Sequence, residues 1–227
     1  GCHYRYIHSR NIFINSSTMI VKTSRQTTFH LLLSMEGSTI PIILPKILFE
    51  NVTYKIHAFR GKSDLIKKLP ERLKGYQCWI PDDYRIIILV DRDNEDCQML
   101  KEKLENIAQQ TGLITKTISE DKKTFQVLNR IAIEELEAWF FGDIQAIVSA
   151  YPKVSTNVGQ QAKYRKPDEI TGGTWENLEK ILQKAGYHRG GLEKVKAARE
   201  ISQFMTPAHN CSPSFQIFYQ GLLAMIS

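Results

Sequence analysis

The segment PDDYRIIILVDRD, residues 81–93, decides the fold class. Five successive apolar residues, Ile86 to Val90, stand between turn-forming residues on one side and Asp91 on the other. A short apolar run bounded in this way is typical of a central strand that is buried on both faces, as in a parallel sheet. We therefore predict a strand over 85–90, and the rest of the chain has to supply its neighbours.

Short apolar runs alternate with longer helical periods from Phe29 onward, which predicts an α/β protein. The other expected strands are 29–35, 54–59 and 127–133, and 113–118 is either an edge strand or a loop. The expected helices are 40–48, 63–74, 94–110 and 136–150. The predicted fold class is thus a mostly parallel, Rossmann-like sheet that is flanked by helices and followed by a helical C-terminal extension.

Two residues qualify the expected helix over 63–74. Ser63 is a candidate N-cap, because its hydroxyl can accept a hydrogen bond from a free N–H of the first turn. Pro70 lies inside the segment and predicts a break or kink, because proline lacks the N–H that the helix needs.

The character of the sequence changes after Pro152, where Gly- and Lys-rich helical pieces replace the strands. Helices are expected over 175–185, 192–205 and 214–226. We predict three parts: a poorly ordered extension over 1–28, an α/β core over 29–150, and a helical C-terminal appendix over 151–227 that packs on the core.

The formal net charge of +6 is unevenly distributed along the 227 residues. Residues 1–30 hold four bases and no acids, residues 31–150 hold 16 bases and 18 acids, and residues 151–227 hold ten bases and six acids. This pattern suits an acidic site between cationic surfaces and a polyanionic partner such as nucleic acid. Solvated charge on ordinary helix faces explains it about as well.

The longest apolar stretch, residues 31–49, contains two charged residues and two prolines, so no transmembrane helix is expected. The four cysteines are widely spaced and form no Cys-x-x-Cys pair. They therefore suggest neither a zinc ribbon nor a secreted disulfide framework, and we expect a cytoplasmic protein. No Ser/His/Asp or Cys/His combination predicts a nucleophilic enzyme.

Acidic residues follow three of the expected strands: Glu36 after the first, Asp91 and Asp93 after the third, and Glu134, Glu135 and Glu137 after the fourth. The carboxyl ends of parallel strands form one edge of a sheet, where ligands bind. Carboxylates that converge there repel one another unless a cation neutralises them, and oxygen ligands select Mg²⁺ or Mn²⁺. The alternative is turn chemistry at a strand end and acids that complement a helix dipole.

Phosphate contacts are a second expectation. Gly61-Lys62-Ser63 resembles a phosphate-contacting turn at a helix N-terminus, although the full P-loop spacing is absent and ATP binding is not inferred. Arg92, within the acidic cluster, and Arg189, between two expected helices, are further candidates for nucleic-acid contact. An N-capped turn and a solvated loop are the simpler interpretations of these residues.

Glu36-Gly37 after the first strand and Asp91-x-Asp93 after the third resemble the Toprim pattern of topoisomerases, bacterial primases and OLD-family nucleases. Five segments, in order, resemble a Toprim-like bacterial family labelled as a domain of unknown function: GKSDLIKKLPERLKGY (61–76), IILVDRDNEDC (87–97), IAIEELEAWFFGD (131–143), GGTWENLEKILQKAGY (172–187) and SPSFQIF (212–218). The similarity runs from about Phe29 to the C-terminus.

The resemblance implies roles for the acidic residues. Glu36 would be a general acid/base or a metal ligand, and Asp91 and Asp93 would hold Mg²⁺ (or Mn²⁺) for phosphodiester chemistry. OLD-type nucleases use further acids for a second metal, for which Glu135 and Glu137 are the candidates. The implied function is a metal-dependent nuclease that binds DNA, works with a separate ABC- or AAA-type ATPase and takes part in phage defence. The alternatives are a non-catalytic subunit of an ATPase complex and a small-molecule phosphoesterase.

Overall fold

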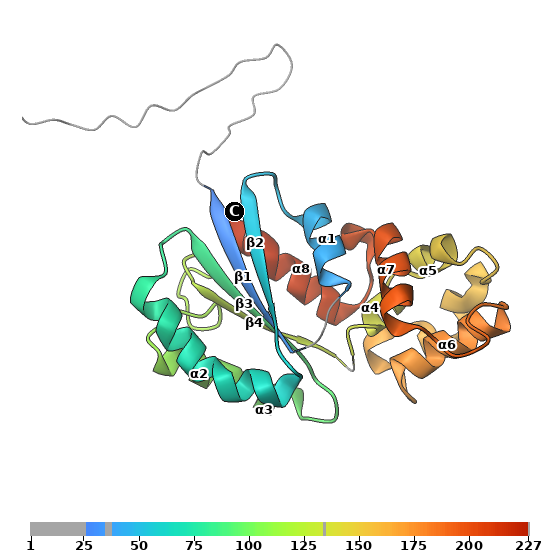
Figure 1. Ribbon diagram of the computed structural model, residues 1–227, viewed down its shortest axis with the longest axis horizontal. Helices are drawn as coiled ribbons and strands as arrows, with labels where there is room; N and C mark the ends of the chain where they lie inside the picture. The colour runs from blue at the N-terminus through green and yellow to red at the C-terminus, as the bar shows by residue number, and fades with distance from the viewer. Residues whose placement is uncertain (1–25, 35–37, 134, 227) are drawn as a thin grey trace, which may run out of the picture.

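The computed structural model describes residues 26–34, 38–133 and 135–226. It confirms the α/β fold class: four parallel strands form one sheet in the order β2-β1-β3-β4, with helices on both faces (Figure 1). The strands are β1 (Thr27–Leu33), β2 (Val52–Ala58), β3 (Tyr84–Asp91) and β4 (Val127–Ala132). Because β1 begins at Thr27, the sheet starts two residues before the expected boundary of the core.

The helices follow the order that the sequence predicts. Those of the core are α1 (Ile40–Ile47), α2 (Lys62–Trp79), α3 (Cys97–Gln110), α4 (Ala138–Phe141) and α5 (Ile144–Ala150). Those of the C-terminal part are α6 (Thr174–Lys184), α7 (Lys194–Phe204) and α8 (Pro213–Ile226). The 3-10 turns are η1 (Thr156–Gln160), η2 (Ala162–Tyr164), η3 (Pro167–Glu169) and η4 (Pro207–His209).

Helix α2 departs from the prediction at both ends. Its N-cap is Gly61, with φ of +87°, so Ser63 lies inside the helix and does not cap it. The helix also continues through Pro70 to Trp79. A proline inside a helix costs about 3 kcal/mol, and burial of apolar side chains along one face of the helix offsets this cost; they include Leu65, Leu69 and Leu73.

The helix expected over 136–150 is divided in two. Asp143 begins α5 as its N-cap, where its carboxylate accepts from the N–H of Ala146 and also from that of Thr206. Just before it, a Cβ added to Gly142 would lie 2.0 Å from Oδ1 of Asn210. The break therefore lets the chain after α7 pack against the end of α4. The segment 113–118 is a loop that makes one isolated bridge, between Thr115 and Val127.

Side chains alternate between two hydrophobic layers, as the period of two in a strand requires. Ile86, Ile88 and Val90 pack toward α2 and α3. Ile87 and Leu89 face the other layer, which contains α1, α4 and α8. Asp91 continues this second series, so its side chain is directed to the layer that also holds the C-terminal helices.

Helices α6 and α7 lie beyond the carboxyl ends of the strands, while α8 returns along one face of the sheet (Figure 1). One hydrophobic cluster contains buried residues of both parts, so the helical appendix shares the core of the α/β part. Lys46 fixes the end of α7, because its ammonium donates to the backbone carbonyls of Ser202, Gln203 and Met205.

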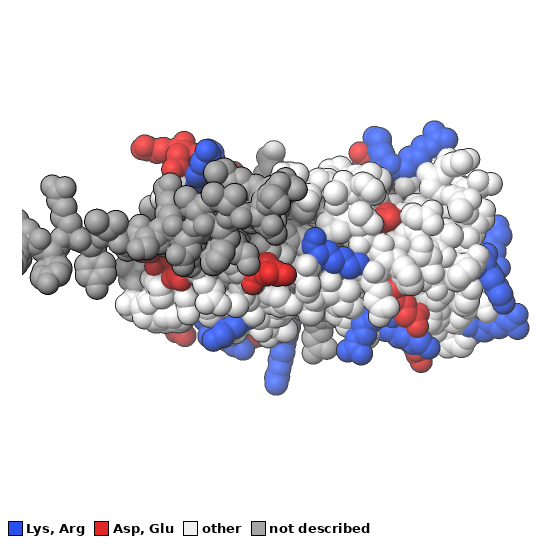
Figure 2. Space-filling model, turned by 90° about the horizontal axis from the view of Figure 1, so that it is seen from above, with Lys and Arg blue, Asp and Glu red and all other residues white. Residues whose placement is uncertain are grey.

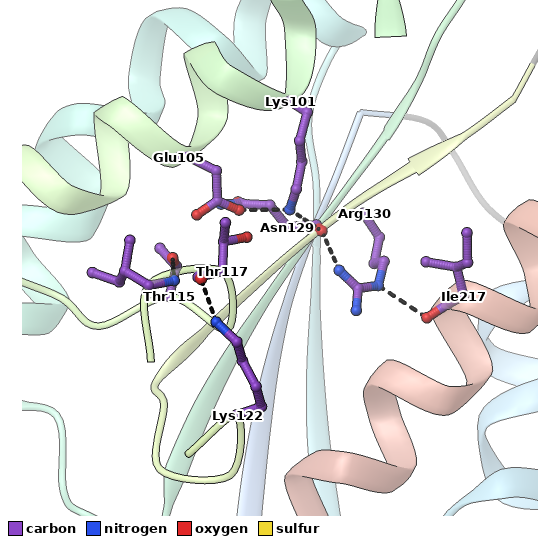
Figure 3. A network of polar contacts seen from close by, with 9 residues as sticks. Lys101, Glu105, Thr115, Thr117, Lys122, Asn129, Arg130 and Ile217 are labelled. Atoms are coloured by element: carbon purple, nitrogen blue, oxygen red, sulfur yellow. Dashed lines mark hydrogen bonds and ion pairs between the residues drawn. The ribbon is translucent and has the colours of Figure 1, made fainter. Parts of the chain in front are cut away.

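Strand β4 carries a buried polar network between α3 and α8 (Figure 3). Glu105 of α3 accepts from Lys101 and from the amide of Asn129, and Lys101 also donates to the carbonyl of Asn129. Arg130 donates to the carbonyls of Asn129 and Ile217. The network joins two helices to the edge strand.

No α-helix in the described part of the chain has both the length and the apolar character needed to cross a bilayer. Cys78, Cys97 and Cys211 are free thiols.

Candidate functional site

The candidate site lies where the strand order changes direction. The chain builds β1 and β2 on one side and then β3 and β4 on the other, so the crevice beyond β1 and β3 is the switch point where open α/β sheets bind ligands. Asp91 is the last residue of β3 at this position. Its backbone N–H donates to Oγ of Ser34, directly after β1.

Asp91 is a half-buried acid that forms no ion pair with any cation among the described residues. Its Oδ1 has no hydrogen-bond partner within the described residues, while the carboxylate accepts from the backbone N–H of Leu136. Burial, followed by the negative charges of Asp93 and Glu135, raises the pKa of Asp91 to about 7. The group is therefore partly protonated at neutral pH unless a cation approaches it.

Glu135 and Glu137 approach the same place from the loop after β4. Glu135 accepts a hydrogen bond of 2.6 Å from the hydroxyl of Thr174, the first residue of α6. Burial, together with the charges of Asp91 and Glu135, raises the pKa of Glu137 to about 8. Two acids of this group thus hold protons where free carboxylates would have lost them.

The four acids line one cleft of about 290 Å³. Its other walls come from the residues after β1, from α6 and from the first turns of α7: Ser38, Thr39, Leu136, Trp175, Lys194, Val195 and Ala198. Among the residues described, Asp91, Asp93, Glu135 and Glu137 are therefore brought together as the sequence predicts.

Lys194 is the cation of the cleft. Its ammonium lies 5.2 Å from the centre of the Trp175 ring and forms no ion pair with any carboxylate of residues 26–34, 38–133 or 135–226. Its charge lowers the pKa of Glu137 against the larger effect of burial. The aromatic ring holds this ammonium at the cleft wall without neutralising the acids.

Lys62, which the sequence predicts to contact phosphate, contacts acceptors of the turn after β3 in the structure. Its Nζ lies 2.8 Å from Oδ2 of Asp93, 2.8 Å from Oε1 of Glu95 and 2.8 Å from the carbonyl of Arg92. Three acceptors use all three of its N–H groups, and its side chain is only 11% exposed. Lys62 therefore stabilises the turn after β3, in which Asp93 has a φ of +50°.

The remaining predicted site residues either do not line the acidic cleft or lie outside the described residues. Glu36 and Glu134 lie outside the described residues. Ser63 and Arg189 do not line the cleft, and Arg189 belongs to the exposed loop between α6 and α7. Arg92 donates from Nε to the carbonyl of Asp93.

The donor set fits a hard divalent cation in its chemistry. All four acids offer oxygen ligands, and the unpartnered Oδ1 of Asp91 is available to one. Within the described residues, no three His, Cys, Asp or Glu side chains are already arranged to enclose a metal ion. Asp93 would have to share its carboxylate between a cation and Lys62.

Thr174, Trp175 and Lys194 are the contributors that sequence reasoning missed. Trp175 and Thr174 lie in one of the segments that carry the family resemblance, but no local motif marks Lys194. Its place in the site arises only when α7 packs beyond the sheet.

The view in Figure 2 shows Lys and Arg side chains along the end of the molecule that the C-terminal helices form (right). This distribution agrees with the ten bases and six acids of residues 151–227. The acidic cleft thus adjoins the more basic part of the chain.

Comparison with known proteins places the chain in a family. Residues 6–223 match the family described as "Domain of unknown function (DUF4276)". The chain belongs to this DUF4276 family. No curated protein and no solved structure matches it. The match covers the acidic cleft and the helices that complete it, so the DUF4276 domain comprises both parts of the fold.

Proposed function

We propose that this DUF4276 protein is a Mg²⁺- or Mn²⁺-dependent phosphodiesterase of Toprim-like type, acting as a nuclease. The observation that carries the proposal is the cleft in which four acids converge, two of which, Asp91 and Glu137, have raised pKa values. Strongly perturbed carboxylates in a cleft are typical of functional sites. A divalent cation would supply the positive charge that these acids lack.

Asp91, Glu135 and Glu137 would hold the cation, with Asp93 shared between it and Lys62. A bound Mg²⁺ would polarise a phosphate oxygen and lower the pKa of a coordinated water. Asp91 and Glu137 would lose their protons as the cation binds, because opposite charge favours the ionised form.

The position of Lys194 favours a substrate that carries negative charge. Its ammonium lines the acidic cleft but pairs with none of the described acids, so it can bind a phosphate oxygen opposite them. A cation at the acids and the ammonium of Lys194 would together stabilise the negative charge of a phosphodiester.

Two finer features rest on the resemblance to OLD-family nucleases alone. They are a separate ABC- or AAA-type ATPase as partner and a role in phage defence. Asp91 and Asp93 match the Toprim Asp-x-Asp motif, and this match is the basis for both.

The test is nuclease activity of the full chain on plasmid DNA and on RNA, with Mg²⁺, with Mn²⁺ and with a chelator. We expect cleavage that needs the metal and falls by about 100-fold or more in Asp91→Asn combined with Glu137→Gln. The matched control is Asp82→Asn with Glu102→Gln, which makes the same two replacements at exposed positions away from the cleft.

Three outcomes contradict the proposal. Cleavage that survives in the Asp91/Glu137 variant places the activity elsewhere. Hydrolysis of small phosphomonoesters without cleavage of DNA or RNA indicates a small-molecule phosphoesterase. Metal binding without any hydrolysis, with or without an ATPase partner, indicates a non-catalytic subunit.

A further inference from the structure

A second cleft, of about 580 Å³, lies on the other side of α7 from the acidic cleft. Glu193, Lys196 and Glu200 line it, at the spacing that puts side chains on one helix face. Lys194, Val195 and Ala198 line the acidic cleft instead. The first turns of α7 therefore form the wall between two separate clefts.

A chain of hydrogen bonds fixes the inner part of the second cleft. The hydroxyl of Tyr151 donates to Oε2 of Glu200 and lies 3.0 Å from Nε2 of His188. Since Tyr151 has only one hydroxyl proton, Nε2 of His188 carries the proton of the second bond. Tyr151 is 4% exposed, and the bonds join three segments that are far apart in the sequence.

The lining is acidic and aromatic. It contains the carboxylates of Glu193 and Glu200 against one ammonium, that of Lys196, which lies 3.7 Å from Glu193. No donor among the described residues binds Oε1 of Glu200. The ring of Tyr187 also lines the cleft, and the ammonium of Lys153 already lies 5.8 Å from its centre.

These features select a positively charged organic ligand. Carboxylates accept from an ammonium group, and tyrosine rings attract cations while they cover alkyl chains. The cleft has the size of a small-molecule site. Two carboxylates disfavour a phosphate-bearing ligand in the same place, even though the whole chain has a net charge of +6.

We propose that the second cleft binds a small aliphatic polyamine, with one ammonium on Glu200 and the methylene chain along the ring of Tyr187. Glu193 at the rim takes another ammonium. This site is independent of the phosphodiesterase proposal, because it uses the opposite face of α7.

The test is isothermal titration of the full chain with spermidine, and with adenosine monophosphate as the anionic probe. We expect one spermidine per chain and an affinity that falls by about tenfold or more in Glu200→Gln. Glu193→Gln is the second variant, since its side chain is 68% exposed and its replacement leaves the buried contacts intact. It should weaken binding in the same direction, and Glu102→Gln should not.

The variant Asp91→Asn with Glu137→Gln should bind spermidine as the natural chain does. Loss of binding in that variant would mean that spermidine occupies the acidic cleft and would overturn the proposal. So would spermidine binding that neither Glu193→Gln nor Glu200→Gln changes, the absence of spermidine binding, or binding of adenosine monophosphate that Glu200→Gln abolishes.

Discussion

Glu105 and Asp91 are both withdrawn from water, yet they titrate in opposite directions. Burial alone would raise the pKa of Glu105, but hydrogen bonds from Lys101 and Asn129 outweigh burial and hold its pKa below the usual range (Figure 3). Burial and neighbouring acids raise the pKa of Asp91 to about 7. Glu137 behaves as Asp91 does, because its pKa is also raised, to about 8.

The difference lies in where the partners are. In the network of Figure 3, a lysine one helical turn away contacts the buried acid. Next to the cleft, Lys62 forms ion pairs with Asp93 and Glu95. At the cleft wall, the ammonium of Lys194 lies over the ring of Trp175. Glu105 has its counter-charge within the chain, whereas Asp91 and Glu137 form no ion pair with a cation among the described residues.

Removing the partner of Glu105 should have the largest effect on stability. Lys101→Met leaves a buried carboxylate without its cation, which we expect to cost about 3 kcal/mol in the free energy of unfolding. Urea unfolding at neutral pH measures it. Lys103→Met, on the exposed face of the same helix, should cost about 0.5 kcal/mol or less. An equal loss of unfolding free energy in the two variants would show that Glu105 does not depend on Lys101. The contrast between Glu105 and Asp91 would then no longer hold.

A divalent cation should stabilise the protein through the cleft. At a concentration about 100 times its Kd, Mg²⁺ or Mn²⁺ would add about 2.7 kcal/mol to the free energy of unfolding. Thermal unfolding at pH 8 should show a higher Tm with the metal, and the shift should disappear in Asp91→Asn with Glu137→Gln. A shift of the same size in that variant would place the metal elsewhere.

Asp91→Asn should stabilise the metal-free protein at pH 8. The pKa of Asp91 is about 7 in the folded chain against 3.8 in the reference state. The folded state therefore keeps a proton that the unfolded state has lost, and stability declines as pH rises through this range. We expect a gain of about 2 kcal/mol for the variant at pH 8, and a flatter stability profile between about pH 6.5 and 7.5, where Asp91 of the natural chain completes its ionisation.

This comparison should be made above about pH 6.5. Below that value, the lowered pKa values of His30 and His57 make stability rise with pH, which opposes the decline caused by Asp91. Measurements above that value report on the acids of the cleft. A variant that is less stable than the natural chain at pH 8 would show that Asp91 is structurally satisfied.

Among these variants, Lys194→Ala should have the smallest effect on the free energy of unfolding. It should weaken substrate binding without weakening metal binding. Its exposed ammonium contributes about 0.5 kcal/mol or less to folding. In the nuclease assay we expect KM for the polynucleotide to rise while metal affinity is kept or improved, because one competing positive charge is gone. Lys196→Ala, on the opposite face of α7, is the matched control. An unchanged KM would exclude Lys194 from substrate binding.

The sheet could be predicted because its signals are local. Ile86 to Val90 mark the central strand, and every expected strand among 29–35, 54–59, 85–90 and 127–133 is present with shifted ends. Pro70 misled the prediction, since packing along α2 outweighs the cost of one missing N–H. The division at Gly142 depends on Asn210, which is far away in the sequence.

The site could be predicted only in its acidic half. Asp91, Asp93, Glu135 and Glu137 lie at or shortly after the ends of β3 and β4, so the topology alone brings them to one edge of the sheet. Lys62 is predicted to contact phosphate, and its contacts with three acceptors in the turn after β3 could not be read from the sequence. Lys194 joins the cleft through helix packing, which no motif records.

The most direct test of the central claim is to measure the carboxyl pKa values of Asp91 and Glu137 by NMR titration, without and with Mg²⁺. The structure predicts values of about 7 and about 8 without the metal, with Glu105 below its usual range as an internal reference. With Mg²⁺, both raised values should fall below about 5. Ordinary values near 4 in the metal-free protein, or raised values that Mg²⁺ leaves unchanged, would contradict a cleft built to receive a cation.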